Sequence, residues 1–257
     1  MQIPKTGIHA GVQPAELAWY QSWFNTSYYH ALYNNRNESE AEEFVVRLTK
    51  TLSLPPGASI LDLPCGKGRH SVSLHSLGYR VTGADLSPAN IEHCRRTHPP
   101  QIRFVEHDMR KPVGIRQFDA VLNLFTSFGY FTHDFENERV VRSAASSLKP
   151  EGYLVLDYLN IEQALNNLVA EETQQRNNLQ FTIRRSLKDG KLIKSIVVDD
   201  QGETHSYSEE IRLLNMADFE RYFKAAGLAI TAVFGDYFLH DFVPEESPRL
   251  IFIARLA

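Results

Sequence analysis

Residues 60–70 read ILDLPCGKGRH, and this stretch decides the fold. An apolar run broken by Asp62 indicates a buried strand that carries a carboxylate near its end. Pro64 follows, and Gly66 and Gly68 then leave the backbone almost bare before a segment with a helical pattern. A strand, a glycine-containing loop and a helix turn backbone N–H groups and a helix N-terminus toward a ligand. The stretch therefore predicts a ligand that has a positive group and approaches the main chain closely.

The composition is that of a soluble globular protein with one large α/β domain or two small ones. The chain has 257 residues, of which 43% are apolar and 23% charged, and both values are ordinary. A net charge of −4 gives no general attraction to phosphate backbones, so a nucleic-acid partner is not indicated. Cys65 and Cys94 show no metal-ligand or disulfide-framework spacing. We see no signal peptide and no membrane-spanning run, so we expect a cytoplasmic protein, whose oligomeric state the sequence leaves open.

Short apolar runs alternate with helical patterns through most of the chain, which is typical of a parallel sheet. Strands are predicted at residues 59–63, 79–85, 102–108, 118–125 and 152–159, and helices at 69–78, 87–98, 134–148 and 215–228. Two closing strands at 229–238 and 249–256 predict a hairpin on the main sheet. Because the runs are rich in β-branched residues, we expect central strands that are buried on both faces.

Two segments depart from this alternation. Residues 14–34 are dense in aromatic side chains and predict one broken helix or two short ones, followed by a helix over 38–52. After residue 171 the pattern changes to period two, with strands predicted at 179–187, 191–200 and 204–214. We therefore expect an α/β protein with a helical lid at 1–54, a main domain at 55–170 and 215–257, and an antiparallel insertion at 171–214 over the substrate side.

Polar side chains follow the predicted parallel strands at the points where they end. Asp85 ends the second strand, Asp108 ends the third and precedes Met109, and Asn123 begins the segment that ends the fourth. Ligands of open parallel sheets bind at the carboxyl ends of the strands, so these groups should converge on one crevice. A carboxylate at Asp85 suits the two hydroxyls of a ribose. The sequence therefore predicts a cofactor that contains a nucleoside.

Two classes of cofactor compete for this crevice. A dinucleotide fold requires a third glycine so that a pyrophosphate can sit on the helix N-terminus, but the third position here is Ser71. The carboxylate of Asp62 would also repel a pyrophosphate. It would attract the ammonium group of a methionine moiety and tolerate a sulfonium. An NAD-dependent oxidoreductase is therefore the weaker hypothesis.

The order of the motifs resembles that of the class I S-adenosylmethionine-dependent methyltransferases. ILDLPCGKGRH, VTGADLSP, FVEHDMR, FDAVLNLFTSFGY and LKPEGYLVLDYLN follow one another within residues 55–160. The insertion and the ending GDY…ESPRLIFIAR are similar to those of bacterial small-molecule methyltransferases. The resemblance implies a Rossmann-like sheet of seven strands ordered 3-2-1-4-5-7-6, with strand 7 antiparallel. It also implies S-adenosyl-L-methionine as cofactor, S-adenosyl-L-homocysteine as product and in-line methyl transfer to a small-molecule substrate.

The resemblance also implies roles for individual residues. Asp62, Gly66 and Gly68 would hold the methionine part, Asp85 and Leu86 the ribose and adenine, Asp108 and Met109 the adenine edge, and Asn123 and Leu124 the sulfonium. Pro64 replaces the first glycine of the family's D-x-G-x-G-x-G, and its missing N–H predicts altered loop detail with binding retained. From the lid, Tyr29 and Arg36 would reach the methionine end, while Phe128 and Tyr130 would contact the substrate.

The catalytic residues stay unassigned at the level of sequence. His133–Asp134 and His240–Asp241 are candidate general bases, although each pair equally suits a surface loop. The insertion carries basic residues that favour a solvated strand face over an anion site, namely Arg184, Arg185, Lys188, Lys191 and Lys194. The histidines show no metal-ligand spacing. A non-catalytic S-adenosylmethionine-binding protein and an RNA methyltransferase remain the alternatives, the second weakened by the acidic charge balance.

Overall fold

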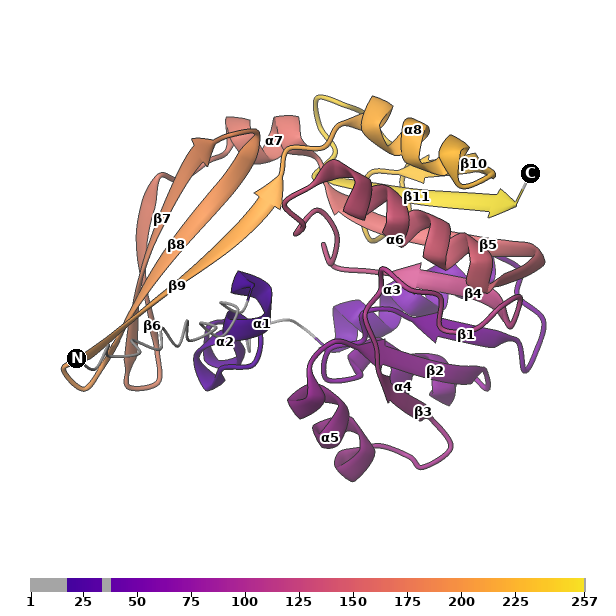
Figure 1. Ribbon diagram of the computed structural model, residues 1–257, viewed down its shortest axis with the longest axis horizontal. Helices are drawn as coiled ribbons and strands as arrows, with labels where there is room; N and C mark the ends of the chain where they lie inside the picture. The colour runs from indigo at the N-terminus through magenta and orange to yellow at the C-terminus, as the bar shows by residue number, and fades with distance from the viewer. Residues whose placement is uncertain (1–17, 34–37, 257) are drawn as a thin grey trace, which may run out of the picture.

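A computed structural model describes residues 18–33 and 38–256 and shows a seven-stranded main sheet flanked by helices (Figure 1). The strands lie in the order β3-β2-β1-β4-β5-β11-β10. Their bounds are β1 Ser59–Asp62, β2 Arg80–Asp85, β3 Arg103–Glu106, β4 Phe118–Asn123, β5 Leu148–Leu159, β10 Leu228–Phe234 and β11 Arg249–Leu256. Strand β11 is antiparallel to both of its neighbours, whereas β1 to β5 pair in parallel. The predicted order and the antiparallel seventh strand are confirmed.

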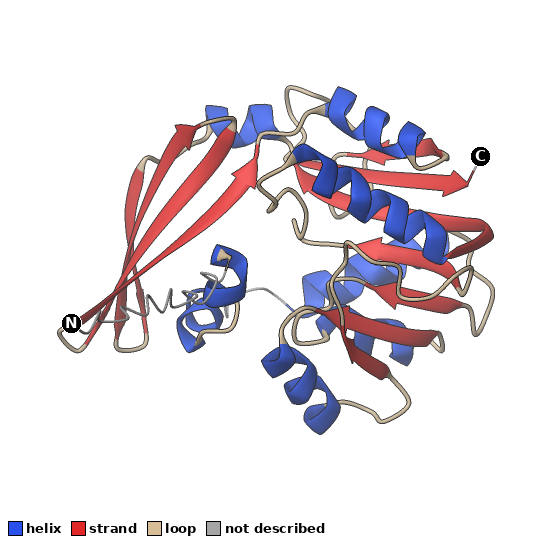
Figure 2. Cartoon of the chain, in the orientation of Figure 1, coloured by secondary structure: helices blue, strands red, loops and turns tan. Residues whose placement is uncertain are grey.

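Helices cover both faces of this sheet, as Figure 2 shows. One face packs against α3 (Glu38–Thr51), α4 (Arg69–Ser76) and α5 (Pro88–Thr97), and the other against α6 (Asp134–Ser147) and α8 (Met216–Ala225). Because both faces are covered, β1, β2, β4 and β11 are almost continuously buried, which explains their apolar sequences. Ser87 and Asn215 are the N-caps of α5 and α8, since each accepts a hydrogen bond from a backbone N–H group inside its helix.

The predicted insertion is a separate antiparallel sheet of four strands, ordered β6-β7-β8-β9. Its strands are β6 Glu171–Arg176, β7 Leu179–Lys188, β8 Lys191–Asp200 and β9 Glu203–Arg212. The sequence did not predict β6, because EETQQR contains no apolar residue that would mark a buried face. It also did not predict α7 (Ile161–Asn166), a six-residue helix that Asn160 caps.

The two short N-terminal helices rest on the inner face of this second sheet. Helices α1 (Trp19–Trp23) and α2 (Ser27–Leu32) bury Trp23 and Leu32 against apolar side chains of β7 and β8. Figure 1 shows both helices between the second sheet and the main domain. They reach the main domain through a hydrogen bond between Asn25 and Ser87. No helix in residues 18–33 or 38–256 is long and apolar enough to cross a membrane.

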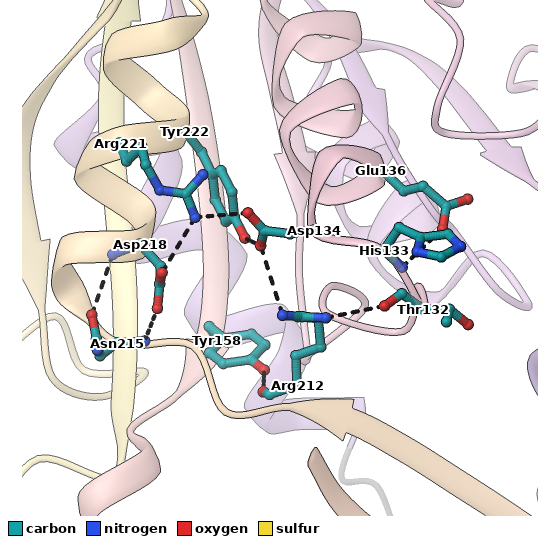
Figure 3. A network of polar contacts seen from close by, with 10 residues as sticks. All are labelled: Thr132, His133, Asp134, Glu136, Tyr158, Arg212, Asn215, Asp218, Arg221 and Tyr222. Atoms are coloured by element: carbon teal, nitrogen blue, oxygen red, sulfur yellow. Dashed lines mark hydrogen bonds and ion pairs between the residues drawn. The ribbon is translucent and has the colours of Figure 1, made fainter. Parts of the chain in front are cut away.

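A polar network fixes the second sheet to the main domain where β9 ends (Figure 3). Arg212, the last residue of β9, donates to the carbonyl oxygen of Thr132 at 3.1 Å and lies 4.0 Å from Asp134. Asp134 also pairs with Arg221 at 2.8 Å and accepts from the Tyr222 hydroxyl. These contacts join β9 to the N-terminus of α6 and to α8, so the orientation of the second sheet is set by the main domain.

Candidate functional site

One large cavity lies between the carboxyl edge of the main sheet, the N-terminal helices and the second sheet. Its volume is about 1270 Å³. Of the residues predicted for binding, the cavity is lined by Tyr29, Pro64, Gly66, Asp85, Leu86, Asp108, Met109, Leu124 and Tyr130. The sheet topology therefore brings together side chains that are far apart in the sequence, as the crevice rule predicts.

Asp62 lies directly beneath the glycine-containing loop and keeps one carboxylate oxygen without a partner. Its side chain is 1% exposed, and its Oδ2 accepts from the Ser71 hydroxyl at 2.6 Å. Its Oδ1 is buried and has no hydrogen-bond partner. Burial raises the pKa of Asp62 to about 7, although Ser71 opposes this shift. An orphaned buried carboxylate oxygen is costly, and a donor arriving with a ligand would relieve that cost.

The loop itself needs glycine at two positions. Gly66 and Gly68 have φ values of 53° and 80°, in the left-handed region that glycine adopts without strain. A Cβ on Gly68 would also lie 3.0 Å from the His98 ring. Gly68 is the N-cap of α4, so the loop ends where the helix N-terminus begins. Pro64 follows a cis peptide bond, and the cavity reaches this residue.

Asp85 connects the loop to the end of β2. Its carboxylate accepts from the backbone N–H of Gly66 at 2.8 Å and from that of Ser87 at 2.9 Å. The Asn90 amide donates to the same group at 3.3 Å. Burial raises the pKa of Asp85, while these donors lower it. Asp85 is thus an acidic residue on the cavity wall that also holds the loop in shape.

The third strand end is more strongly engaged within the protein than the sequence indicates. Asp108 forms a forked ion pair with Arg110, with Nη2 to Oδ2 at 2.8 Å and Nε to Oδ1 at 3.0 Å. Arg110 also pairs with Glu136 at 2.6 Å. Burial alone would raise the pKa of Asp108, but the bonds and charge of Arg110 lower it. Asp108 therefore stays ionised on the cavity wall and retains an acceptor role.

Asn123 ends β4 beneath the cavity surface rather than on it. The side chain is 4% exposed, its Oδ1 is buried without a partner, and its Nδ2 lies 3.8 Å from the Met109 sulfur. Leu124, next in the chain, lines the cavity. Gly68 and Asp62 likewise do not belong to the cavity surface, so three of the predicted residues shape the site from below.

The turn after β4 is held in an uncommon conformation by a buried ion pair that the sequence analysis did not identify. Phe125 and Thr126 have φ values of 55° and 57°, and this left-handed region is strained for both residues. The fully buried Asp157 accepts from the Phe125 backbone N–H at 2.7 Å. Arg249 donates to Asp157 at 2.6 Å and to the Thr126 hydroxyl at 2.7 Å. The sequence feature that could have indicated this buried pair is Asp157, an aspartate inside the apolar run VLDYL of β5.

An aromatic group covers the cavity from the side of the N-terminal helices. Tyr130 lies 5.2 Å from Trp19 and 5.5 Å from Phe24, measured between ring centroids. Tyr29 lies 4.9 Å from Phe24. These four side chains all line the cavity, so Tyr29 and Tyr130 are both on its surface. Arg36 lies outside the described residues.

The predicted substrate role of Phe128 is not supported by its position. Its side chain is fully buried and packs against Tyr158 and Phe219 in the core of the main domain. The TSFGYF sequence does not show which of its aromatic side chains faces the core and which the cavity. In the structure Phe128 faces the core and Tyr130 lines the cavity. We therefore correct the assignment of Phe128 from substrate contact to core packing.

Neither candidate histidine pair lies on the cavity. His133 and Asp134 belong to the network of Figure 3, where Asp134 serves Arg221 and Tyr222. His240 pairs with Asp236 at 2.7 Å, rather than with its sequence neighbour Asp241, and is largely exposed. Asp134 and His240 therefore bond to residues that do not line the cavity.

The second sheet contributes charged residues to the cavity. Arg184 faces outward with 61% of its side chain exposed and pairs with Glu171. Its neighbour Arg185 faces inward, as do Lys194 and Glu209, and all three line the cavity. The exposed fractions of the Arg185 and Lys194 side chains are only 19% and 18%. The prediction of a solvated strand face is thus correct for Arg184, and it is wrong for Arg185 and Lys194.

Comparisons with known proteins agree with this geometry. Residues 60–152 match the family model described as a methyltransferase domain. The putative methyltransferase YqeM of Bacillus subtilis (strain 168) is 37% identical over 108 residues, which cover 41% of this chain and 44% of that protein. The dTDP-3-amino-3,6-dideoxy-alpha-D-glucopyranose N,N-dimethyltransferase of Streptomyces fradiae is 29% identical over 185 residues, 68% of this chain and 72% of that protein.

A solved structure shows that the fold is shared over nearly the whole chain. The S-adenosylmethionine-dependent methyltransferase from Clostridium acetobutylicum ATCC 824 superposes with a TM-score of 0.76 at 16% identity. The superposition covers 90% of this chain and 96% of that one. It therefore includes at least part of the second sheet, because the rest of the chain is shorter than the covered length.

Proposed function

Because this chain belongs to the class I S-adenosylmethionine-dependent methyltransferases, we propose that it methylates a nitrogen atom of a small polar metabolite. The observation that carries the proposal is the continuous cavity that runs from the glycine loop to the second sheet. One end offers the strand-end carboxylates, and the other is enclosed by aromatic and charged side chains. Enclosure on all these sides suits a small molecule better than a folded RNA.

The residues at the carboxyl edge of the main sheet fit S-adenosylmethionine. The orphaned Oδ1 of Asp62 is a buried acceptor for the ammonium group of the methionine part. The left-handed glycines Gly66 and Gly68 keep side chains away from the approaching ligand. We propose Asp85 for the ribose hydroxyls, with Leu86 and Met109 beside the adenine and Asp108 at its edge. When bound, the cofactor supplies an electrophilic methyl group on a sulfonium.

The chain's own contribution is orientation and the exclusion of water. Tyr29, Tyr130, Trp19 and Phe24 form an apolar cover over the space beside the loop. Holding two reactants in line supplies on the order of 7–11 kcal/mol of the barrier. A dry site also strengthens the effect of fixed dipoles on the charge that the reaction disperses. Alignment by this cover is therefore the main catalytic device that we propose.

A nitrogen acceptor is favoured over a hydroxyl because His30, one of the histidines that line the cavity, is a weak base. Burial and the charge of Lys67 lower the pKa of His30, a cavity residue, to about 4, so this imidazole is neutral at pH 7. A neutral imidazole of such low basicity assists little in ionising a hydroxyl. An amine needs only to lose its extra proton before attack. The relative from Streptomyces fradiae is named as an N,N-dimethyltransferase, which agrees with this choice.

The test is a set of acceptors matched in all but the nucleophilic atom. Glucosamine, glycine and ethanolamine are compared with glucose, glycolate and ethylene glycol, and S-adenosylhomocysteine formation is measured. We expect turnover with at least one amine and none with its hydroxyl partner. Turnover of the hydroxyl compounds alone would overturn the nitrogen assignment. Absence of S-adenosylmethionine binding in titration calorimetry would overturn the cofactor as well.

A further inference from the structure

The inner face of the second sheet carries a row of charges between two apolar regions. Arg185 of β7 and Lys194 of β8 are register partners, and Lys194 is in turn the register partner of Glu209 on β9. Helices α1 and α2 cover the apolar side chains on one side of this row, around Ile183 and Ile196. We call Arg185, Lys194 and Glu209 the polar row. It lies where the helical cover ends and the cavity begins.

The acceptor capacity of the polar row is already used within the protein. Glu209 accepts from the Trp23 indole N–H at 2.7 Å and from the Tyr33 hydroxyl at 2.7 and 2.9 Å. The Lys194 ammonium lies 3.4 Å from the same carboxylate. These contacts bind the N-terminal helices to β9. They leave Glu209 as a fixed anchor and not as a receptor for a cationic ligand.

The donor capacity of the polar row is only partly used. Arg185 donates to the Val169 carbonyl oxygen at 2.9 Å and to Glu172, whereas a guanidinium has five N–H donors. Lys194 donates to the Tyr33 hydroxyl and pairs with Glu209, whereas an ammonium has three donors. The spare hydrogen-bonding capacity that faces the cavity therefore consists of donors on two cations.

The polar row carries an excess of positive charge on the cavity surface, although each cation already has a carboxylate partner. Like charges directly opposite each other on paired strands repel. Burial lowers the pKa of Lys194, which reflects the unfavourable environment of its charge. Glu172 pairs with Arg185 but does not line the cavity, so the cavity surface of the row presents two cations and one anion. An oxyanion in the cavity would meet both cations at once.

We propose that the methyl acceptor carries an oxyanion, a carboxylate or a phosphate, and that Arg185 and Lys194 bind it. This inference rests on the proposed function and names the substrate class, an anionic amine. A guanidinium recognises either group through two parallel N–H donors, and the ammonium adds a third contact. Anchoring the oxyanion on the second sheet leaves the amine end of the molecule facing the aromatic cover and the glycine loop.

The experiment compares amines that differ only in the anion. Glycine is set against glycinamide, and glucosamine 6-phosphate against glucosamine, with S-adenosylhomocysteine formation as the readout. The two pairs separate a carboxylate from a phosphate as the preferred group. We expect the anionic member of at least one pair to have a kcat/KM at least tenfold higher. Equal or better use of both neutral members would overturn the proposal and leave amine methylation intact.

Variants of the polar row assign the preference to its residues. Arg185→Gln and Lys194→Gln should each reduce kcat/KM for the preferred anionic amine by about 10- to 100-fold, because a hydrogen bond to a charged group contributes about 1.5–3 kcal/mol. Arg185→Lys, which keeps the charge, should recover part of the loss. Arg184→Gln is the matched control, since this neighbour faces outward and pairs with Glu171. A loss in Arg184→Gln equal to that in Arg185→Gln would overturn the assignment.

A binding measurement keeps the inference testable without turnover. The protein is saturated with S-adenosylhomocysteine and titrated calorimetrically with glucosamine 6-phosphate and with glycine. We expect at least one to bind the wild type and to lose at least tenfold in affinity in Arg185→Gln, with circular dichroism confirming the fold. Such binding without methylation of any amine would support the anion site and contradict the proposed function. Affinities unchanged in Arg185→Gln and Lys194→Gln would contradict the anion site.

Discussion

The two walls of the cavity are built by different rules and carry opposite charges. The main sheet presents Asp85 and Asp108 on the cavity wall, and Asp62 lies just below the cavity surface. Asp62 and Asp85 end their parallel strands, and Asp108 follows the end of β3 by two residues. The second sheet presents Arg185 and Lys194, which meet only because β7 pairs with β8 in one register. A parallel sheet collects strand ends through its topology, whereas an antiparallel sheet collects side chains through its register. A shift of one residue in that register would place the two cations on opposite faces of the sheet.

This difference gives each wall its own partner in the proposed reaction. The acidic wall suits the positive methionine end of the cofactor, and the basic row suits an anionic acceptor. The N-terminal helices join the walls, because Trp23 bonds to Glu209 of the second sheet and Asn25 bonds to Ser87 of the main domain. The relative position of the two reactants therefore depends on a segment of the chain that belongs to neither sheet.

Removing this connection gives the largest expected effect. A chain without residues 1–33 loses the cover of Phe181, Ile183, Ile196 and Val198, and the Tyr33 and Trp23 donors of Glu209. We expect methyl transfer to fall by about a thousandfold or more, because alignment supplies on the order of 7–11 kcal/mol. S-adenosylhomocysteine should still bind in calorimetry, since Asp62 and Asp85 lie on the main sheet. Transfer at a comparable rate would show that the two walls align the reactants alone.

The turn after β4 provides a second test, this time of the main domain. Asp157→Ala leaves the buried Arg249 without its carboxylate and releases the Phe125 N–H. Breaking a buried pair in this way destabilises a protein by about 3–5 kcal/mol. Asp119→Ala is the matched control, because Asp119 also lies within a strand of the main sheet but forms a partly exposed pair with Lys149. Asp119→Ala should lower the free energy of unfolding by about 1 kcal/mol. Denaturant unfolding measures the free energy of unfolding of both variants. Equal losses of stability would show that Asp157 does not stabilise the turn after β4.

The contrast between the walls also explains which features the sequence could predict. The insertion and the acidic strand ends follow from local patterns, because one motif marks each strand end. The strand order came from the resemblance to a known family. Arg184 and Arg185 are adjacent in β7, so they point to opposite faces of the second sheet. The sequence alone did not show which of the two points toward the cavity. The strand β6 was missed because an exposed edge strand needs no apolar residues. Phe128 and Tyr130 are separated by two positions of an irregular loop, where neither helical nor strand period applies.

The partners of the carboxylates were also beyond local patterns. Arg249 follows Asp157 by more than ninety residues in the chain, and only the antiparallel pairing of β11 with β5 brings them together. The sequence did show that a charged residue interrupted the apolar run of β5. An unpaired carboxylate cannot be buried at low cost, so a cationic partner could be inferred, although not which one.

On the acidic wall, Asp85→Ala should reduce affinity for S-adenosylhomocysteine by at least tenfold, because it removes a charged acceptor from two ribose hydroxyls. Its bonds to Gly66, Ser87 and Asn90 mean that the variant should also lose about 1–3 kcal/mol of stability. Glu106→Ala is the matched control, since Glu106 lies on the same rim at the end of β3 and is exposed. Calorimetry that finds equal losses for both variants would assign the effect to general charge rather than to Asp85.

The smallest effect is a pH dependence that belongs to Asp62. Its pKa in the unliganded protein is raised to about 7, mainly by burial. The folded state therefore binds more protons than the unfolded state between about pH 4 and 7, so this group lowers stability as the pH rises through that range. A ligand ammonium beside the carboxylate favours the ionised form, so binding should release a proton below pH 7. Affinity for S-adenosylhomocysteine should then rise between pH 5.5 and 7, by at most about tenfold for each pH unit.

Titration calorimetry over this range in two buffers of different ionisation enthalpy measures both the affinity and the proton release. Asp62→Asn is the decisive comparison, because it keeps the shape of the side chain and removes the titration. We expect the variant to bind more weakly than the wild type at pH 7 and to show a flat profile from pH 5.5 to 7. The Ser71 hydroxyl can still bond to the amide oxygen, so the loop should keep its conformation. If Asp62→Asn shows the same pH dependence of affinity as the wild type, the titrating group is another residue of the acidic wall. Asp62 would then not contact the ammonium group.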